Sequence, residues 1–179
     1  SSSVKYVIIH PGLIRISQYV FSNCFCLERI DFLPVSQLQI IDKYAFQKTS
    51  IKSISIPSST IQIGEGAFEF CFYLQKVEIP ANSKLKRIGA EAFSESGIKI
   101  LSMPSSISEL DESWCQNIKE LNDITIFQSE QQNIMYFDDK FILQKSDPQS
   151  DVFDILAFAR RDIKNVVIPP FIKKIAPYA

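Results

Sequence analysis

The chain has 179 residues, of which 46% are hydrophobic and 22% are charged, a composition typical of a folded protein rather than a disordered one. Its 19 Lys and Arg residues nearly balance its 20 Asp and Glu residues, and this net charge of −1 argues against a nucleic-acid-binding domain. No segment approaches the ~18 consecutive apolar residues of a transmembrane helix, so we expect no membrane insertion within this chain.

The 27 isoleucines are regularly placed, in a pattern of apolar residues at positions i, i+3 and i+5. The copies are Val4/Val7/Ile9, Leu27/Ile30/Phe32, Ile51/Ile54/Ile56, Leu74/Val77/Ile79, Ile98/Leu101/Met103, Leu121/Ile124/Ile126 and Ile163/Val166/Ile168. The steps between copies are 23, 24, 23, 24, 23 and then 42 residues. A short β-branched run that ends near proline predicts a strand, because Val and Ile pack well on a pleated surface and proline cannot continue the ladder. Strands one period apart must lie parallel, about 4.8 Å from each other.

A second pattern in each period ends in a small residue followed by an aromatic one. Its copies are Leu13/Ile16/Val20/Phe21, Leu38/Ile41/Ala45/Phe46, Thr60/Ile63/Ala67/Phe68 and Leu85/Ile88/Ala92/Phe93. The fifth copy keeps Ile107 and Leu110 but places Trp114 in the small slot and Cys115 in the aromatic slot. We expect this segment to return the chain along the opposite face as a strand followed by a short helical turn. The two patterns together predict a β-rich, right-handed solenoid whose coils bury their apolar edges by stacking.

Residues 51–80 show both patterns best. They contain Ile56-Pro57-Ser58-Ser59, Ile63-Gly64-Glu65-Gly66-Ala67-Phe68, Cys71 and Leu74-x-x-Val77-x-Ile79-Pro80. This dual motif resembles the BspA-like class of leucine-rich repeats, and the resemblance covers about 4–126 and 163–179. Proteins of that class are commonly cell-surface or secreted proteins of mucosal bacteria and protozoan parasites, linked to adhesion. The resemblance implies a non-enzymatic domain that binds a protein or glycan of a host surface. An intracellular scaffold or recognition module in the cytoplasm is the alternative.

The long step of 42 residues indicates an interruption of the repeats. Residues 133–136 and 141–145 are expected to form two strands across an acidic turn, a hairpin that either covers one face or projects as a recognition element. We therefore interpret the chain as a single solenoid unit over 1–179, with regular repeats over 4–126, a hairpin insertion over 127–150, and a degenerate coil and truncated repeat over 151–179. In the degenerate coil, Ala157 and Phe158 fill the small and aromatic slots and Phe153 the isoleucine slot.

The last residues fit an unfinished repeat. Ile172, Ile175 and Ala179 occupy the slots that precede an aromatic residue in a complete copy. We expect the chain to be a fragment of a longer solenoid. An open apolar end also predicts end-to-end self-association.

The residues that carry chemistry are sparse. Cys24 and Cys71 share a slot two coils apart, about 10 Å, which exceeds the reach of a disulfide, so we expect small buried residues there. His10 has no carboxylate or nucleophile at motif spacing, and the acidic residues near Asp138 match no calcium-binding loop. We expect no cofactor, no metal and no catalytic residue.

The outward positions of the predicted strands remain as candidate binding residues. Leucine-rich repeats commonly bind partners on this strand face, so the resemblance implies a partner-binding site there. Exposed aromatic, arginine and apolar side chains contribute binding energy most often. The candidates are Tyr6, Ile8, Arg29, Asp31, Lys76, Glu78, Ile100 and Asp123.

Overall fold

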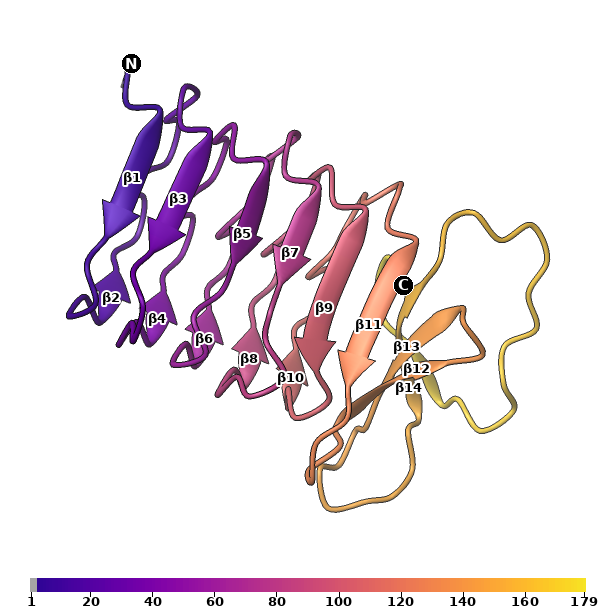
Figure 1. Ribbon diagram of the computed structural model, residues 1–179. Helices are drawn as coiled ribbons and strands as arrows, with labels where there is room; N and C mark the ends of the chain where they lie inside the picture. Colours follow the sequence, from indigo (N-terminus) through magenta and orange to yellow (C-terminus); the bar gives the residue numbers. More distant parts are fainter. Residues whose placement is uncertain (1–2) are drawn as a thin grey trace.

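The computed structural model describes residues 3–179, so residues 1 and 2 of the predicted single unit lie outside the described residues. The chain forms a parallel β-solenoid in which each coil contributes one strand to a front face and one short strand to the opposite side (Figure 1). The front strands are β1 (Tyr6–Ile9), β3 (Arg29–Phe32), β5 (Ser53–Ser55), β7 (Lys76–Glu78), β9 (Ile100–Pro104) and β11 (Asp123–Phe127). The return strands are β2 (Arg15–Ile16), β4 (Ile40–Ile41), β6 (Gln62–Ile63), β8 (Arg87–Ile88) and β10 (Glu109–Leu110). The predicted parallel stacking is confirmed.

The return side places the second sequence pattern in continuous columns. The return strands pair in one parallel sheet, with the isoleucine slot of each copy aligned with the next: Ile16, Ile41, Ile63, Ile88 and Leu110. The aromatic residues stack ring on ring, with centroids 5.2 to 5.3 Å apart: Phe21, Phe46, Phe68 and Phe93. Each coil thus buries the apolar edge of its neighbour, as stacking of repeats requires.

The fifth copy keeps the backbone geometry of the others. The Phe93 N–H donates to the Trp114 carbonyl at 2.9 Å, as the Phe68 N–H does to Ala92 at 2.7 Å. Trp114 therefore occupies the small slot, as predicted, and its buried ring meets Phe93 edge-on at 6.4 Å. An exchange of small and large residues within one slot pair leaves the core filled.

The short helical turns predicted after the return strands are not shown by the structure. Each turn instead has two residues with φ between 54° and 63°, four positions apart: Tyr19 and Asn23, Tyr44 and Lys48, Gly66 and Phe70, Glu91 and Glu95, Ser113 and Asn117. Such left-handed residues interrupt a right-handed helix. The turn N–H groups donate to the next coil, as Tyr44 does to Glu65, Phe46 to Ala67 and Lys48 to Glu69, at 2.8 to 2.9 Å.

Two kinds of coil alternate, which explains the alternating steps of 23 and 24 residues. The turn after the front strand has five residues at 33–37 and 80–84, but three at 57–59 and 104–106. The corner before the front strand alternates in the opposite sense. It has two residues at Phe25-Cys26, Phe72-Tyr73 and Lys119-Glu120, and one at Ser50 and Gly97. Coils two steps apart are therefore closer equivalents than immediate neighbours.

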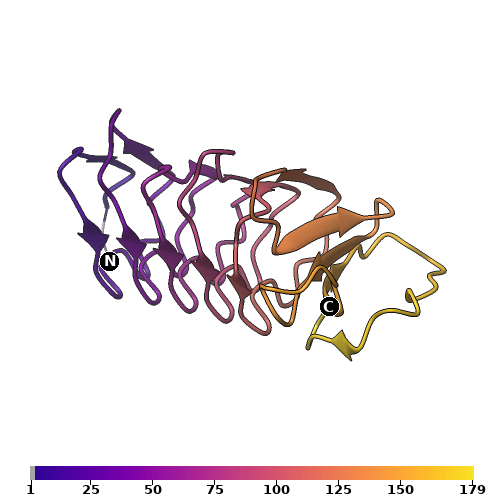
Figure 2. The same ribbon diagram turned by 90° about the horizontal axis from the view of Figure 1, so that it is seen from below.

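The predicted hairpin is present and closes one end of the solenoid. Strands β12 (Ile134–Phe137) and β13 (Phe141–Gln144) are antiparallel, and β14 (Ile155–Ala159) adds a third antiparallel strand (Figure 2). Ile134, Ile142 and Phe158 are fully buried in the same core as the repeats. The hairpin thus covers the last coil, which supports the covering role over the projecting one.

Two expectations for the C-terminal part are wrong. Residues 163–168 form no strand, and Val166 and Val167 are 46% and 87% exposed. Because β14 runs antiparallel to β13, no parallel front strand is available to pair with this copy, and the chain forms a wide loop at the right of Figure 1. β15 (Lys174–Ile175) pairs with β14 so that Ile175 lies opposite Leu156. Leu156, not Phe153, therefore fills the isoleucine slot.

The four cysteines differ in exposure, and this predicts their reactivity. Cys71 is fully buried, and burial raises its pKa to about 11; burial also raises the pKa of Cys115. Cys26 is exposed. Since the thiolate is the reactive form, we expect a thiol reagent at pH 8 to modify Cys26 within minutes and to reach Cys71 and Cys115 only after unfolding. Mass spectrometry of the labelled peptides measures this, and rapid labelling of Cys71 in the native protein would contradict it.

Candidate functional site

All eight candidate binding residues lie on the front face, on strands β1, β3, β7, β9 and β11. The register aligns Tyr6 with Arg29, and Ile8 with Asp31. Lys76, Ile100 and Asp123 continue one column farther along the solenoid, with Glu78 two residues beyond Lys76. Their side chains are exposed or half-buried, while the alternate strand residues point into the core. The predicted outward columns are confirmed; the binding role of these residues stays a prediction.

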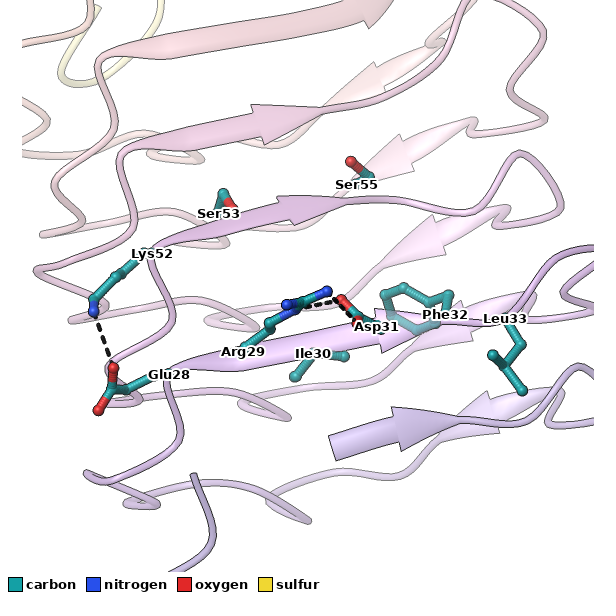
Figure 3. Close-up of a pocket in the computed structure, with 9 residues that line it drawn as sticks. All are labelled: Glu28, Arg29, Ile30, Asp31, Phe32, Leu33, Lys52, Ser53 and Ser55. Carbon is teal, nitrogen blue, oxygen red and sulfur yellow. Dashed lines mark hydrogen bonds and ion pairs between the residues drawn. The ribbon is translucent and has the colours of Figure 1, made fainter. Parts of the chain in front are cut away.

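The front face is interrupted between β3 and β5. β1 and β3 form one parallel sheet and β5, β7, β9 and β11 another, with no ladder joining β3 to β5. A groove of about 740 Å³ lies along this interruption (Figure 3). We call it the β3–β5 groove; it is lined by Glu28, Arg29, Ile30, Asp31, Phe32, Leu33, Lys52, Ser53 and Ser55. The sequence analysis missed it, although two serines as the outward residues of β5 leave room for a ligand.

A charged cluster joins the groove to β1. The Arg29 guanidinium donates two hydrogen bonds to the Asp31 carboxylate, at 2.9 and 2.6 Å, and the Tyr6 hydroxyl donates to the same carboxylate at 2.5 Å. The guanidinium carbon also lies 5.2 Å from the centre of the Tyr6 ring. The hydrogen bonds from Arg29 and Tyr6 lower the pKa of Asp31, and the bond to Asp31 raises the pKa of Tyr6. The carboxylate is therefore ionised and held in place near neutral pH.

The other side of the groove carries a second set of paired groups. Lys52 lies 2.9 Å from Glu28 across the top of the groove, and Lys76 lies 2.8 Å from Glu78 on the neighbouring strand. The Ser55 hydroxyl donates to Glu78 at 2.9 Å. The structure thus brings Tyr6, Arg29 and Asp31 into direct contact, whereas Ile100 and Asp123 lie on strands farther from the groove.

These groups are suited to binding rather than to reaction. The groove presents ionised side chains, hydroxyls and the apolar edge of Phe32 and Leu33, which can recognise a polar partner. Its two serines have no histidine or lysine base within hydrogen-bond distance among residues 3–179. No group of three or more His, Cys, Asp and Glu side chains in the same residues could hold a metal ion. The described chain also contains no helix long and apolar enough to cross a membrane.

The repeat geometry agrees with a match to a known family. The BspA-type leucine-rich repeat region matches this chain in six copies, over residues 1–122, 39–144 and 83–179. The chain belongs to the BspA-type leucine-rich repeat family. The resemblance noted from residues 51–80 is therefore confirmed. A search of curated protein sequences finds no match to this BspA-type chain.

Two solved structures share the fold of this BspA-type chain. The pneumococcal vaccine antigen PcpA superposes with a TM-score of 0.83 at 22% identity, over 96% of this chain and 41% of its own. A leucine-rich cell surface protein from Faecalibacterium prausnitzii A2-165 superposes with a TM-score of 0.66 at 18% identity, over 94% of this chain and 50% of its own. The chain thus spans half or less of the length of these proteins. At these identities the likeness establishes the fold.

Proposed function

We propose that this chain is a non-enzymatic repeat domain that binds a protein or glycan, in a cell-surface protein that mediates adhesion or host interaction. The observation that carries this proposal is the β3–β5 groove with its exposed cluster of Tyr6, Arg29 and Asp31. The cluster is rigid because each polar group is held by another, so little side-chain entropy is lost when a partner binds. An aromatic ring and an arginine at the centre of a concave surface are typical of residues that dominate binding energy.

The surface location is supported by the family and by the solved structures. One similar structure is a cell surface protein and another is a vaccine antigen. One fold supports many functions, so this support is by analogy and needs a direct test. Antibody staining of intact cells should detect the protein without permeabilisation. Detection only after permeabilisation would contradict the surface location.

An intracellular scaffold is the second candidate, and one observation favours it. All four cysteines are free, and Cys26 is exposed. Free exposed thiols persist in the reducing cytoplasm more readily than outside the cell. The same staining experiment distinguishes the two locations, because a scaffold would be stained only in permeabilised cells.

The binding surface itself can be tested with a double variant. Arg29→Ala combined with Lys76→Ala should weaken adhesion of the purified chain to host cells or glycans about tenfold, because both side chains lie on the front face near the groove. Thermal unfolding should be unchanged, since exposed ion pairs contribute little stability. The matched control, Lys84→Ala with Lys86→Ala, removes two exposed charges away from this face. Equal adhesion of wild type and the Arg29/Lys76 variant would place the binding site elsewhere.

A further inference from the structure

The corners that lead into the front strands form a notched edge, along the top of Figure 1 where the strand arrows begin. Long corners with two residues project beyond short corners with one residue, so the edge is recessed at each short corner. The residues of this corner edge are Phe25, Cys26, Ser50, Phe72, Tyr73, Gly97, Lys119 and Glu120. The two recesses, at Ser50 and at Gly97, coincide with two separate cavities of the surface.

The first notch is flanked by two aromatic rings. Phe25 and Tyr73 belong to long corners two coils apart and are 57% and 61% exposed, with Ser50 between them. The Ser50 hydroxyl donates to the Phe25 carbonyl at 2.6 Å, which fixes the short corner. This notch has a volume of about 330 Å³. Within residues 3–179 the Tyr73 hydroxyl makes no hydrogen bond, so this donor is available to a ligand.

The second notch lies on the other side of the same aromatic corner. Phe72, 62% exposed, forms one wall, and Lys119 and Glu120 form the other, around a volume of about 220 Å³. Its floor is Gly97. A Cβ atom there would lie 2.2 Å from the Phe72 carbonyl oxygen, so a side chain does not fit at this position.

The spacing of the two notches matches one kind of peptide. Their floors, Ser50 and Gly97, are two coils apart, which is about 10 Å for stacked strands. A polyproline II helix has three residues per turn and a rise of about 3.1 Å, so residues i and i+3 lie on one side about 9.3 Å apart. Grooves between exposed aromatic rings are the usual binding sites for prolines in this conformation. Two prolines three residues apart would therefore reach both notches.

The charges at the two notches are opposite. Lys5, Lys52 and Glu28 line the first notch, an excess of one positive charge, and Glu95, Glu120 and Lys119 line the second, an excess of one negative charge. A peptide with an acidic residue beside one proline and a basic residue beside the other complements both. The polyproline II backbone has no internal hydrogen bonds, so its carbonyl groups can accept from the Tyr73 hydroxyl and from the two lysines.

We propose that the corner edge binds a proline-rich segment of a partner protein in the polyproline II conformation, with prolines at i and i+3 in the two notches. This surface lies beside the front face and does not include Arg29, Asp31 or Lys76. It gives the domain a second contact with a partner, or a contact with a second partner. Its failure would leave the proposed front-face site untouched.

The spacing of the prolines provides the sharpest test. Fluorescence anisotropy of the full chain with a labelled Asp-Pro-Ala-Ala-Pro-Lys peptide should show saturable binding. Peptides with one or three residues between the prolines should bind at least tenfold more weakly, since the second proline then misses its notch. A peptide with Asn and Gln in place of the charged residues should bind several-fold more weakly. Absence of saturable binding, or equal affinity for all three spacings, would overturn the proposal.

Variants locate the binding to the edge. Tyr73→Ala and Phe25→Ala should each reduce peptide affinity about tenfold, and Ser50→Leu should abolish binding by filling the first notch. Tyr19→Ala is the matched control, because it removes a 55% exposed aromatic ring from a return turn. Circular dichroism melting curves confirm that each variant is folded. The Arg29/Lys76 double variant should bind the peptide normally. Binding of a β-linked oligosaccharide instead of the peptide, lost in Tyr73→Ala, would assign the edge to glycans and refute the proposal.

Discussion

Replacing Phe68 by alanine is expected to lower the free energy of unfolding by about 3–5 kcal/mol, the range for a core phenylalanine. The Phe68 ring is fully buried between Phe46 and Phe93, with ring centroids 5.2 and 5.3 Å away. Its loss would leave a cavity that the flanking rings cannot close, because each is fixed by its own coil. The aromatic column would also be divided into two parts, and contacts between neighbouring coils are the main source of stability in repeat proteins.

Urea unfolding followed by circular dichroism measures this loss. Phe72→Ala is the matched control, since it removes the same side chain from the same coil where the ring is 62% exposed. Substitutions at such surface positions usually change stability by less than about 0.5 kcal/mol. A loss below about 1 kcal/mol for Phe68→Ala would show that the aromatic slot is not part of the core.

Gly97→Ala is expected to destabilise the chain by about 1–3 kcal/mol through overpacking. The added Cβ would lie 2.2 Å from the carbonyl oxygen of Phe72, a backbone atom that cannot rotate away. The two coils would have to separate at this corner, and the Gly97 N–H would lose its bond to the Cys71 carbonyl, 3.3 Å away. The φ angle is not the cause, because Gly97 is not in the left-handed region.

Gly12→Ala is the matched control for this substitution. A Cβ atom at residue 12 would meet only the His10 ring at 3.5 Å, an ordinary contact distance. The difference between the two alanine variants in thermal unfolding therefore isolates the close approach of coils. Equal melting temperatures would mean that the corner at Gly97 has room that the structure does not show.

The coil stacking could be predicted from the sequence because one position in three or five repeats the same chemistry. Ile41, Ile63 and Ile88 specify one register, since a slip by one residue would move all of them to solvent. The outward columns follow from the same alternation. The helical turns were not predictable from that pattern, because left-handed residues such as Tyr44 and Lys48 are ordinary side chains with no sequence mark of their φ angles.

The missed features depend on neighbours rather than on the local pattern. Val166 and Ile168 have the spacing of a front strand, but a strand forms only where a partner strand is available, and β14 runs in the opposite direction to β13. The β3–β5 groove is also a relation between two strands, each of which looks regular alone. The corner lengths were visible in the sequence, as one residue at Ser50 and two at Phe72-Tyr73, but their meaning required the structure.

The alternation of the two coil types has a consequence for how this protein can change in length. Removal of residues 51–97 would join the corner at Ser50 to a coil that again has a short turn and a two-residue corner, so every remaining interface would be of a kind already present. Removal of residues 51–73 alone would place two coils of the same kind in contact, an interface that occurs nowhere among residues 3–126. The unit that can be gained or lost without penalty is thus a pair of coils, 51–97, and not the single repeat that the sequence displays.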